Sequence, residues 1–301
     1  MKLILKHPLL LRYWNRSFAI AEEPILLLSL PRSGSSWLGE VLAQQDDVRY
    51  LREPITSVYM TILSKGVSFF MPNSCKYHAL YQTAADNAFN AKLNYPNSVV
   101  YKGSDWYDLK NKKKLLIKEV NPLFLHDFMC RFKPKVIYLE RCVYATAKSF
   151  MALGWKGDDL FSERFDPITL EKILSVKADL LTQDFYFQMG FLQGVILAIN
   201  EPHFSSNNIL RVSYEDIIAN PKVEVAKITA FLNYGNTAQV QQYIEESLSS
   251  QDSYQVGTFS TKRNSKQLQE KQKQERLEPN YEKTIQAYNL GYTGFKAKMQ
   301  S

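Results

Sequence analysis

Residues 31–37 bring together the side chains with the clearest chemical purpose in the chain. They read Pro-Arg-Ser-Gly-Ser-Ser-Trp, with one guanidinium, three hydroxyls and one glycine. The apolar run Ile25–Leu30 before them predicts a buried strand, and Trp37–Ala43 predicts a helix. A helix N-terminus offers free amides and the positive end of a dipole. The strand–loop–helix unit therefore predicts a cradle for a phosphate or sulfate group.

The loop differs from the P-loop of nucleoside triphosphatases. That loop reads G-x-x-x-x-G-K-[ST], and its lysine and hydroxyl serve the phosphates and Mg²⁺. Here no lysine follows Gly34, and the basic residue, Arg32, precedes the glycine. A guanidinium donates through a planar fork to two oxygens at once. The pattern disfavours a Mg²⁺-dependent kinase and favours an anion site that needs no metal.

The stretch Pro31–Leu38 resembles the 5′-phosphosulfate loop of sulfotransferases that use 3′-phosphoadenosine 5′-phosphosulfate (PAPS). Its arginine-containing form is closest to the carbohydrate 6-O-sulfotransferases and is also similar to the tyrosylprotein sulfotransferases. The resemblance implies that Trp37 stacks near the adenine of the cofactor, with a helix core position as the alternative. It also implies that the following loop residues bind the phosphosulfate group: Arg32, Ser33, Gly34, Ser35 and Ser36.

A second strand–helix unit supports this resemblance. Lys135–Glu140 predicts a buried strand, and Cys142–Leu153 predicts a helix. Arg141 lies between them, and Ser149 follows in an Arg-x7-Ser pattern. Within residues 135–153 this arrangement is similar to the 3′-phosphate motif of the same family. The resemblance implies that Arg141 and Ser149 bind the 3′-phosphate of the cofactor.

Transfer of a sulfuryl group to a hydroxyl needs a group that accepts the hydroxyl proton. Glu53 follows the predicted strand Val48–Leu51 in Tyr-Leu-Arg-Glu-Pro, and the resemblance implies that it is the base. Charge that develops during transfer must be stabilised, and Arg32 is suited to this by its position. The placement of Lys118 is similar to that of a lysine that assists transfer in several sulfotransferases, with a solvated lysine at a strand end as the alternative. The rival base is His126, because the cytosolic branch of the family uses a histidine.

Two segments nearer the C-terminus are similar to cofactor contacts of the family. Tyr214 lies in Arg-Val-Ser-Tyr-Glu-Asp, which matches R-x-x-Y-E-D, and its ring is expected near the adenine. Ser-Thr-Lys-Arg-Asn-Ser resembles the S-T-x-R-N-S loop, which implies that Thr261 and Arg263 contact the cofactor. Residues 267–276 are almost all polar or charged, where relatives often have a tryptophan. Whether residues 258–276 cover the cofactor therefore stays open.

Composition narrows the class of protein and its location. The net charge of +7 suits anionic ligands, and no helix-turn-helix, zinc or RNA-recognition signature suggests nucleic acid. The three cysteines, Cys75, Cys130 and Cys142, form no C-x-x-C pair, which fits a reducing compartment. Basic residues interrupt the apolar runs of residues 1–20, so we expect no transmembrane segment and a cytoplasmic enzyme. Peripheral contact of this end with a membrane is the alternative.

Leu115–Val120 and Asn208–Tyr214 predict two further strands, and Asp166–Ala198 is predicted to be mainly helical. The alternation of predicted strands and helices indicates a single α/β domain over residues 1–301. We expect a P-loop-like, mostly parallel sheet with helices on both faces and the ligand beyond the carboxyl ends of the strands. Residues 24–54 hold the phosphosulfate loop and the base. Residues 56–115 have no clean period and are expected to form the variable region that binds the acceptor.

These observations predict a PAPS-dependent O-sulfotransferase that releases 3′-phosphoadenosine 5′-phosphate (PAP). A carbohydrate or glycoconjugate is the favoured acceptor, because the arginine loop, the glutamate and the Ser-Thr-Lys-Arg-Asn loop resemble that branch. Sulfation of a peptide tyrosine, a lipid or a small phenol or alcohol is the alternative within enzymes. A non-catalytic nucleotide-binding protein on the same fold is the alternative from another class.

Overall fold

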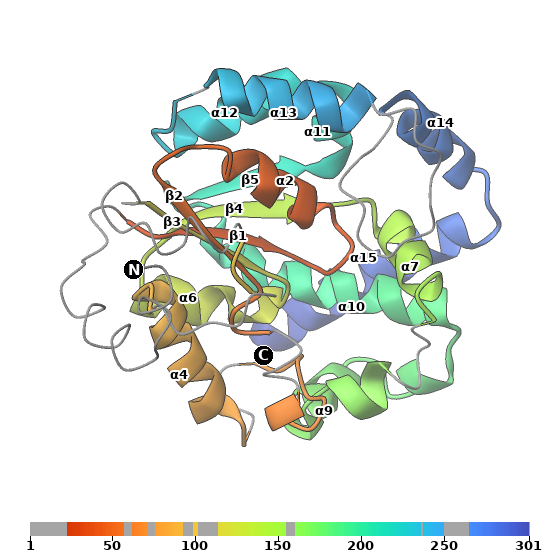
Figure 1. Cartoon of the computed structure of the whole chain (residues 1–301). Helices are drawn as coiled ribbons and strands as arrows, with labels where there is room; N and C mark the ends of the chain where they lie inside the picture. The colour runs from red at the N-terminus through yellow and green to blue at the C-terminus, as the bar shows by residue number, and fades with distance from the viewer. Residues whose placement is uncertain are drawn as a thin grey trace.

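A computed structural model describes residues 23–56, 62–71, 76–92, 99–101, 114–154, 160–235, 237–249 and 265–300. Five strands form one sheet in the order β2-β3-β1-β4-β5 (Figure 1), and every pairing in it is parallel. Their bounds are β1 Ile25–Ser29, β2 Val48–Arg52, β3 Lys114–Glu119, β4 Lys135–Glu140 and β5 Ile209–Ser213. The predicted single α/β domain with a parallel sheet is confirmed.

The central strand β1 lies between β3 and β4. All five of its residues are buried, which follows from the cover of helices on both faces of a parallel sheet. In its register Leu27 lies opposite Lys118 on one side and Ile137 on the other. The carboxyl ends of these strands therefore meet at one edge, where the predicted loops begin.

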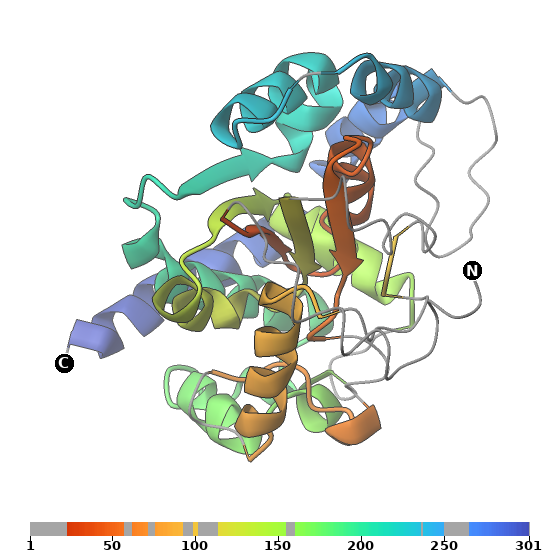
Figure 2. The same ribbon diagram turned by 60° about the vertical axis from the view of Figure 1, so that its left-hand side comes forward.

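Helices cover both faces of the sheet (Figures 1 and 2). One face carries α2 Ser35–Leu42, α11 Tyr214–Ala219, α12 Pro221–Phe231 and α13 Ala238–Ser249. The other carries α4 His78–Phe89, α6 Leu125–Arg131, α7 Val143–Met151, α9 Pro167–Leu174, α10 Phe185–Asn200 and α15 Asn280–Gln300. A further helix, α14, spans Ser265–Glu275. The short helical turns are η2 Pro122–Phe124, the π-helical η3 Leu160–Arg164, η4 Leu180–Thr182 and η5 Glu201–His203.

The observed helices differ from the prediction in two places. The stretch 166–198 divides into α9 and α10, because each has its own aspartate at the N-terminus. Asp166 accepts a hydrogen bond from the amide of Thr169, and Asp184 accepts one from the amide of Phe187, both at 3.1 Å. The sequence also indicated no regular element between residues 56 and 115, whereas α4 lies there. Among the described helices, none is long and apolar enough to cross a membrane.

Candidate active site

The loop between β1 and α2 has the shape of an anion cradle. Arg32 and Gly34 have φ angles of +69° and +92°, and Gly34 is the N-cap of α2. No side chain caps α2, and its first turn holds no acidic residue. The amides of that turn and the positive end of the dipole therefore face the loop. A Cβ atom at Gly34 would overlap the ring of Tyr214, so only glycine fits this position without a shift.

The serines of the loop have different surroundings. Ser33 and Ser35 are buried, and Ser29 Oγ donates a hydrogen bond of 2.9 Å to Ser35 Oγ. Ser36 is half-buried and accepts a hydrogen bond of 3.2 Å from Lys118 Nζ. Ser36 is therefore the loop hydroxyl that contacts a predicted catalytic cation.

Lys118 joins the loop to the predicted base. Its side chain is 5% exposed, and its ammonium group contacts both Ser36 Oγ and the carboxylate of Glu53. The Glu53 side chain is 35% exposed. The backbone amide of Glu53 donates to the carbonyl of Lys118 at 2.7 Å, with Glu53 at φ +53°. The structure thus brings two predicted catalytic residues from separate segments together beside the phosphosulfate loop.

Arg141 and Ser149 contact the phosphosulfate loop directly. Arg141 Nη1 donates to the carbonyl of Arg32 at 2.6 Å, and Arg32 Nε donates to Ser149 Oγ at 3.0 Å. The guanidinium carbon of Arg141 lies 5.0 Å from the centre of the Tyr214 ring. The sequence indicated two separate cationic loops, whereas the structure links them through these contacts. Their predicted role at the 3′-phosphate stays a prediction.

The N-terminus of α7 faces a carboxylate that the sequence reasoning did not single out. The amide of Cys142 donates to Glu215 Oε1 at 3.0 Å, and Ser213 Oγ donates to Glu215 Oε2 at 3.3 Å. Burial raises the pKa of the Cys142 thiol. This helix end therefore already has an anionic partner, in contrast to α2.

Glu119 is a second functional candidate that the sequence reasoning missed. It is 1% exposed and accepts hydrogen bonds of 2.6 Å from the amide of Ile55 and from Thr56 Oγ1. Burial raises the pKa of this carboxyl to about 8. A glutamate within a predicted buried strand was the only available signal, because its partners are more than sixty residues away in the sequence.

The two predicted adenine contacts are both buried. Trp37 is 3% exposed, packs in the core and donates from its indole N–H to Ser247 Oγ at 2.9 Å. This packing corresponds to the core alternative for Trp37 and leaves almost none of its ring to a ligand. Tyr214 is 2% exposed, beneath Gly34 and Arg141. Both rings pack beneath the loop on its protein side. Their predicted stacking against the adenine stays a prediction.

The last predicted residue that the structure describes, His126, lies outside this cluster. Thr261 and Arg263 are outside the described residues. The ring of His126 has Nδ1 3.2 Å from His203 Nε2, and Nε2 3.6 Å from Cys130 Sγ. Both of its nitrogens thus face residues that contact neither Lys118 nor the loop. This placement favours Glu53 over His126 as the base.

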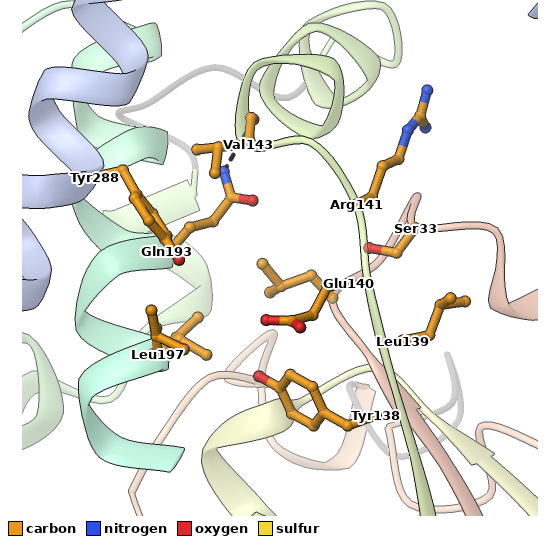
Figure 3. Close-up of a pocket in the computed structure, with 11 residues that line it drawn as sticks. Ser33, Tyr138, Leu139, Glu140, Arg141, Val143, Gln193, Leu197 and Tyr288 are labelled. Carbon is orange, nitrogen blue, oxygen red and sulfur yellow. Dashed lines mark hydrogen bonds between the residues drawn. The ribbon is translucent and has the colours of Figure 1, made fainter. Parts of the chain in front are cut away.

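A small cavity of about 60 Å³ lies behind the loop. Its lining includes Ser33, Glu140, Gln193 and Tyr288, and Figure 3 shows Arg141 extending away from the last two. A water molecule occupies about 30 Å³ of liquid, and ligand pockets usually measure hundreds of cubic ångströms. The cavity therefore has room for ordered water behind the loop.

The chain is similar to several solved structures, and one family model matches most of it. Solved structures of similar fold include the sulfotransferase domain from the curacin biosynthetic pathway, at 15% identity and TM-score 0.45 over 88% of this chain and 96% of that one. Another is the sulfotransferase domain from the Synechococcus PCC 7002 olefin synthase, at 16% identity and TM-score 0.44 over 90% and 95%. A third is a mouse sulfotransferase complexed with PAP, at 19% identity and TM-score 0.36 over 78% and 68%. A search among curated proteins found no match. Residues 22–286 match the sulfotransferase domain family, and the chain belongs to that family.

Proposed function

We propose that this sulfotransferase moves the sulfuryl group of PAPS to an acceptor hydroxyl and releases PAP. The observation that carries the proposal is the position of Lys118, whose ammonium group contacts Ser36 of the phosphosulfate loop and the carboxylate of Glu53. Anion cradle, cation and base thus form one connected group. Membership of the sulfotransferase family supports the same reaction.

The residues present fit a donor with phosphate groups at both ends. The cradle at Gly34 and the open N-terminus of α2 suit its 5′ phosphosulfate, with Arg32 and Lys118 as cations. Arg141 and Ser149 are the proposed ligands of its 3′-phosphate. The Nε atom of Arg141 is buried with no hydrogen-bond partner among the described residues, which is consistent with an anionic partner at this position.

In the proposed reaction the acceptor oxygen forms a bond to sulfur while the bond from sulfur to the 5′-phosphate oxygen breaks. Glu53 takes the hydroxyl proton, for which its partly exposed carboxylate is accessible. Arg32 and Lys118 stabilise the negative charge that develops on the leaving oxygen. PAP departs with the electron pair of the broken bond.

We further propose a carbohydrate or glycoconjugate as the acceptor and the cytoplasm as the location. The acceptor proposal is supported by the resemblance of residues 31–54 to the carbohydrate branch and by the preference for Glu53 over His126. A peptide tyrosine, a lipid and a small phenol or alcohol are the competing acceptors. The three cysteines are odd in number and form no C-x-x-C pair, which argues against a disulfide framework and supports a reducing location.

Calorimetry in the presence of EDTA tests the donor site. We expect PAP to bind at least tenfold more tightly than AMP, since a single charge-assisted contact to the extra phosphate contributes about 1.5–3 kcal/mol. Equal affinities would remove the case for a 3′-phosphate site at Arg141 and Ser149.

Transfer of radiolabelled sulfate from PAPS tests the reaction and the acceptor. The panel should contain oligosaccharides, tyrosine peptides, sterols and simple phenols. We expect label on a sugar hydroxyl. Label on another member alone would overturn the acceptor proposal, and tight PAP binding without transfer to any member would favour the non-catalytic alternative.

A further inference from the structure

Glu119 holds the backbone of the turn that follows the proposed base. One carboxylate oxygen accepts from the amide of Ile55 and the other from Thr56 Oγ1, each at 2.6 Å. These donors lie two and three residues after Glu53. Both hydrogen bonds are short, below the usual value of about 2.9–3.0 Å for an N–H···O bond and about 2.7–2.8 Å for an O–H···O bond.

Lys118 and Glu119 reach the turn from opposite sides of the sheet. Successive side chains of a strand point to opposite faces. Lys118 points toward α2, where it contacts Ser36, and Glu119 lies on the face where Ile55 is buried in the core. The carbonyl of Lys118 also accepts from the amide of Glu53 at 2.7 Å. The end of β3 therefore contacts the turn 53–56 through three separate groups.

We infer that Glu119 is a positioning residue, whose carboxylate fixes the turn 53–56 so that Glu53 faces Lys118. This role rests on the proposed function, in which Glu53 is the base. Glu53 needs such support because its own backbone is left-handed, at φ +53°, which costs a residue with a Cβ about 1–2 kcal/mol. Two hydrogen bonds to the next residues hold that conformation.

Burial of a carboxyl group costs free energy, and a neutral side chain would make a purely structural contact at a lower cost. Glu119 is 1% exposed, and desolvation raises its pKa to about 8. The charged groups that act on it are Glu53, which raises the pKa, and Lys118, which lowers it. Glu119 is therefore coupled both by hydrogen bonds and by charge to the proposed catalytic pair.

Two substitutions separate the hydrogen bonds of Glu119 from its ability to ionise. Glu119→Ala removes both acceptors and should lower kcat about ten- to a hundred-fold, since misplacement of a catalytic group by about 1 Å has this effect. Glu119→Gln removes the ionisable group but keeps an oxygen for the Ile55 amide and an NH₂ for Thr56 Oγ1. It should retain most of the turnover. Thr56→Val loses one of the two contacts and should fall between them, and all three should bind PAP with unchanged affinity.

Asn200→Ala is the matched control for loss of buried polar contacts. Asn200 is fully buried and donates to the carbonyl of Pro122 and to Tyr138 Oη, each at 3.1 Å, away from the turn 53–56. It should lower thermal stability and leave kcat unchanged. If Glu119→Ala behaves in the same way, or if Glu119→Gln loses as much turnover as Glu119→Ala, the positioning role is wrong.

Hydrogen exchange at the Ile55 amide tests the contact without any assay of activity. We expect faster exchange in Glu119→Ala and protection in Glu119→Gln. Unchanged exchange in Glu119→Ala would overturn the positioning role by itself. Faster exchange together with a fully active Glu53→Gln variant would instead show that the base is assigned wrongly while the contact stands.

Discussion

The N-termini of α2 and α7 follow neighbouring parallel strands, and their electrostatic surroundings are opposite. The first turn of α2 has no acidic residue and no side-chain cap, and Lys118 contacts Ser36 within that turn. At α7 the amide of Cys142 already donates to the carboxylate of Glu215. Backbone amides are therefore available to an anion at α2, whereas an anion near α7 depends on the side chains of Arg141 and Ser149.

From this contrast we propose different tasks for the two loops, which are similar in sequence form. The α2 junction combines cradle, cation and base, so changes there should reduce turnover. The α7 junction offers a guanidinium and a hydroxyl, so changes there should reduce cofactor affinity. The two are joined by Arg141 Nη1, which donates to the carbonyl of Arg32.

The largest expected effect comes from Glu53→Gln. Glutamine keeps the size of the side chain and an acceptor for Lys118, but it does not take up a proton at neutral pH. We expect turnover to fall about 10²–10⁴-fold, the range for loss of a general base, with nearly unchanged affinity for PAP. Steady-state kinetics and PAP titration measure the two quantities.

His126→Ala is the companion variant, and thermal unfolding of both variants excludes loss of fold as the cause. His126 contacts His203 and Cys130, so its removal should leave turnover almost unchanged. High activity of Glu53→Gln together with loss of activity in His126→Ala would assign the base to the histidine.

Gly34→Ala tests the shape of the cradle at α2. A Cβ atom there is placed at φ +92° and overlaps the ring of Tyr214. We expect a loss of about 1–2 kcal/mol of unfolding free energy from the backbone and about 1–3 kcal/mol from the overlap, together with weaker PAP binding. Denaturant unfolding and calorimetry measure these changes.

Gly154→Ala, just after α7, is the matched control. Gly154 has φ +77°, and nothing lies within 4 Å of a Cβ built there. This variant should show only the backbone cost and normal PAP affinity. Equal destabilisation of the two variants would mean that the contact between Gly34 and Tyr214 is unimportant.

Arg141→Ala should weaken PAP binding more than Ser149→Ala. The first removes a charge-assisted contact of about 1.5–3 kcal/mol, and the second a neutral one of about 0.5–1.5 kcal/mol. These energies correspond to losses in affinity of about ten- to 150-fold and about two- to tenfold. Lys148→Met is the control on the same helix. The Lys148 ammonium group pairs with Glu278, so this variant loses a positive charge but should bind PAP with normal affinity. A silent Arg141→Ala would contradict the assignment of the 3′-phosphate site.

The smallest effect is expected for Glu215→Gln, and its sign is diagnostic. The amide oxygen still accepts from Cys142, while the negative charge at the N-terminus of α7 is lost. A charge at a helix terminus contributes about 0.3–1 kcal/mol, so PAP should bind about two- to fivefold more tightly at low salt. The gain should shrink at high ionic strength. Unchanged or weaker binding would show that the cofactor does not approach this helix end.

Agreement between sequence and structure is closest where the signals are local. Strand β4 has the predicted bounds, and β1, β3 and β5 differ by one or two residues. Apolar runs between polar breaks are sufficient for these strands. The stretch 166–198 was predicted less well, because helix formers continue across the break and two capping aspartates divide it.

The sequence by itself determined the parallel α/β fold, the loop with Arg32 and Gly34, and the candidates Glu53, Lys118 and Arg141. The fold and the loop depend on residue type and short spacing, which a single chain segment contains, and the three candidates depend on the resemblance of their segments to the sulfotransferase family. Tertiary structure alone decided their partners. Ser149 contacts Arg32, Trp37 is buried against Ser247, and Glu119 binds the turn after Glu53. The strand order β2-β3-β1-β4-β5 and the alternation of side chains across the sheet create these contacts, because both place residues far apart in the sequence at one edge.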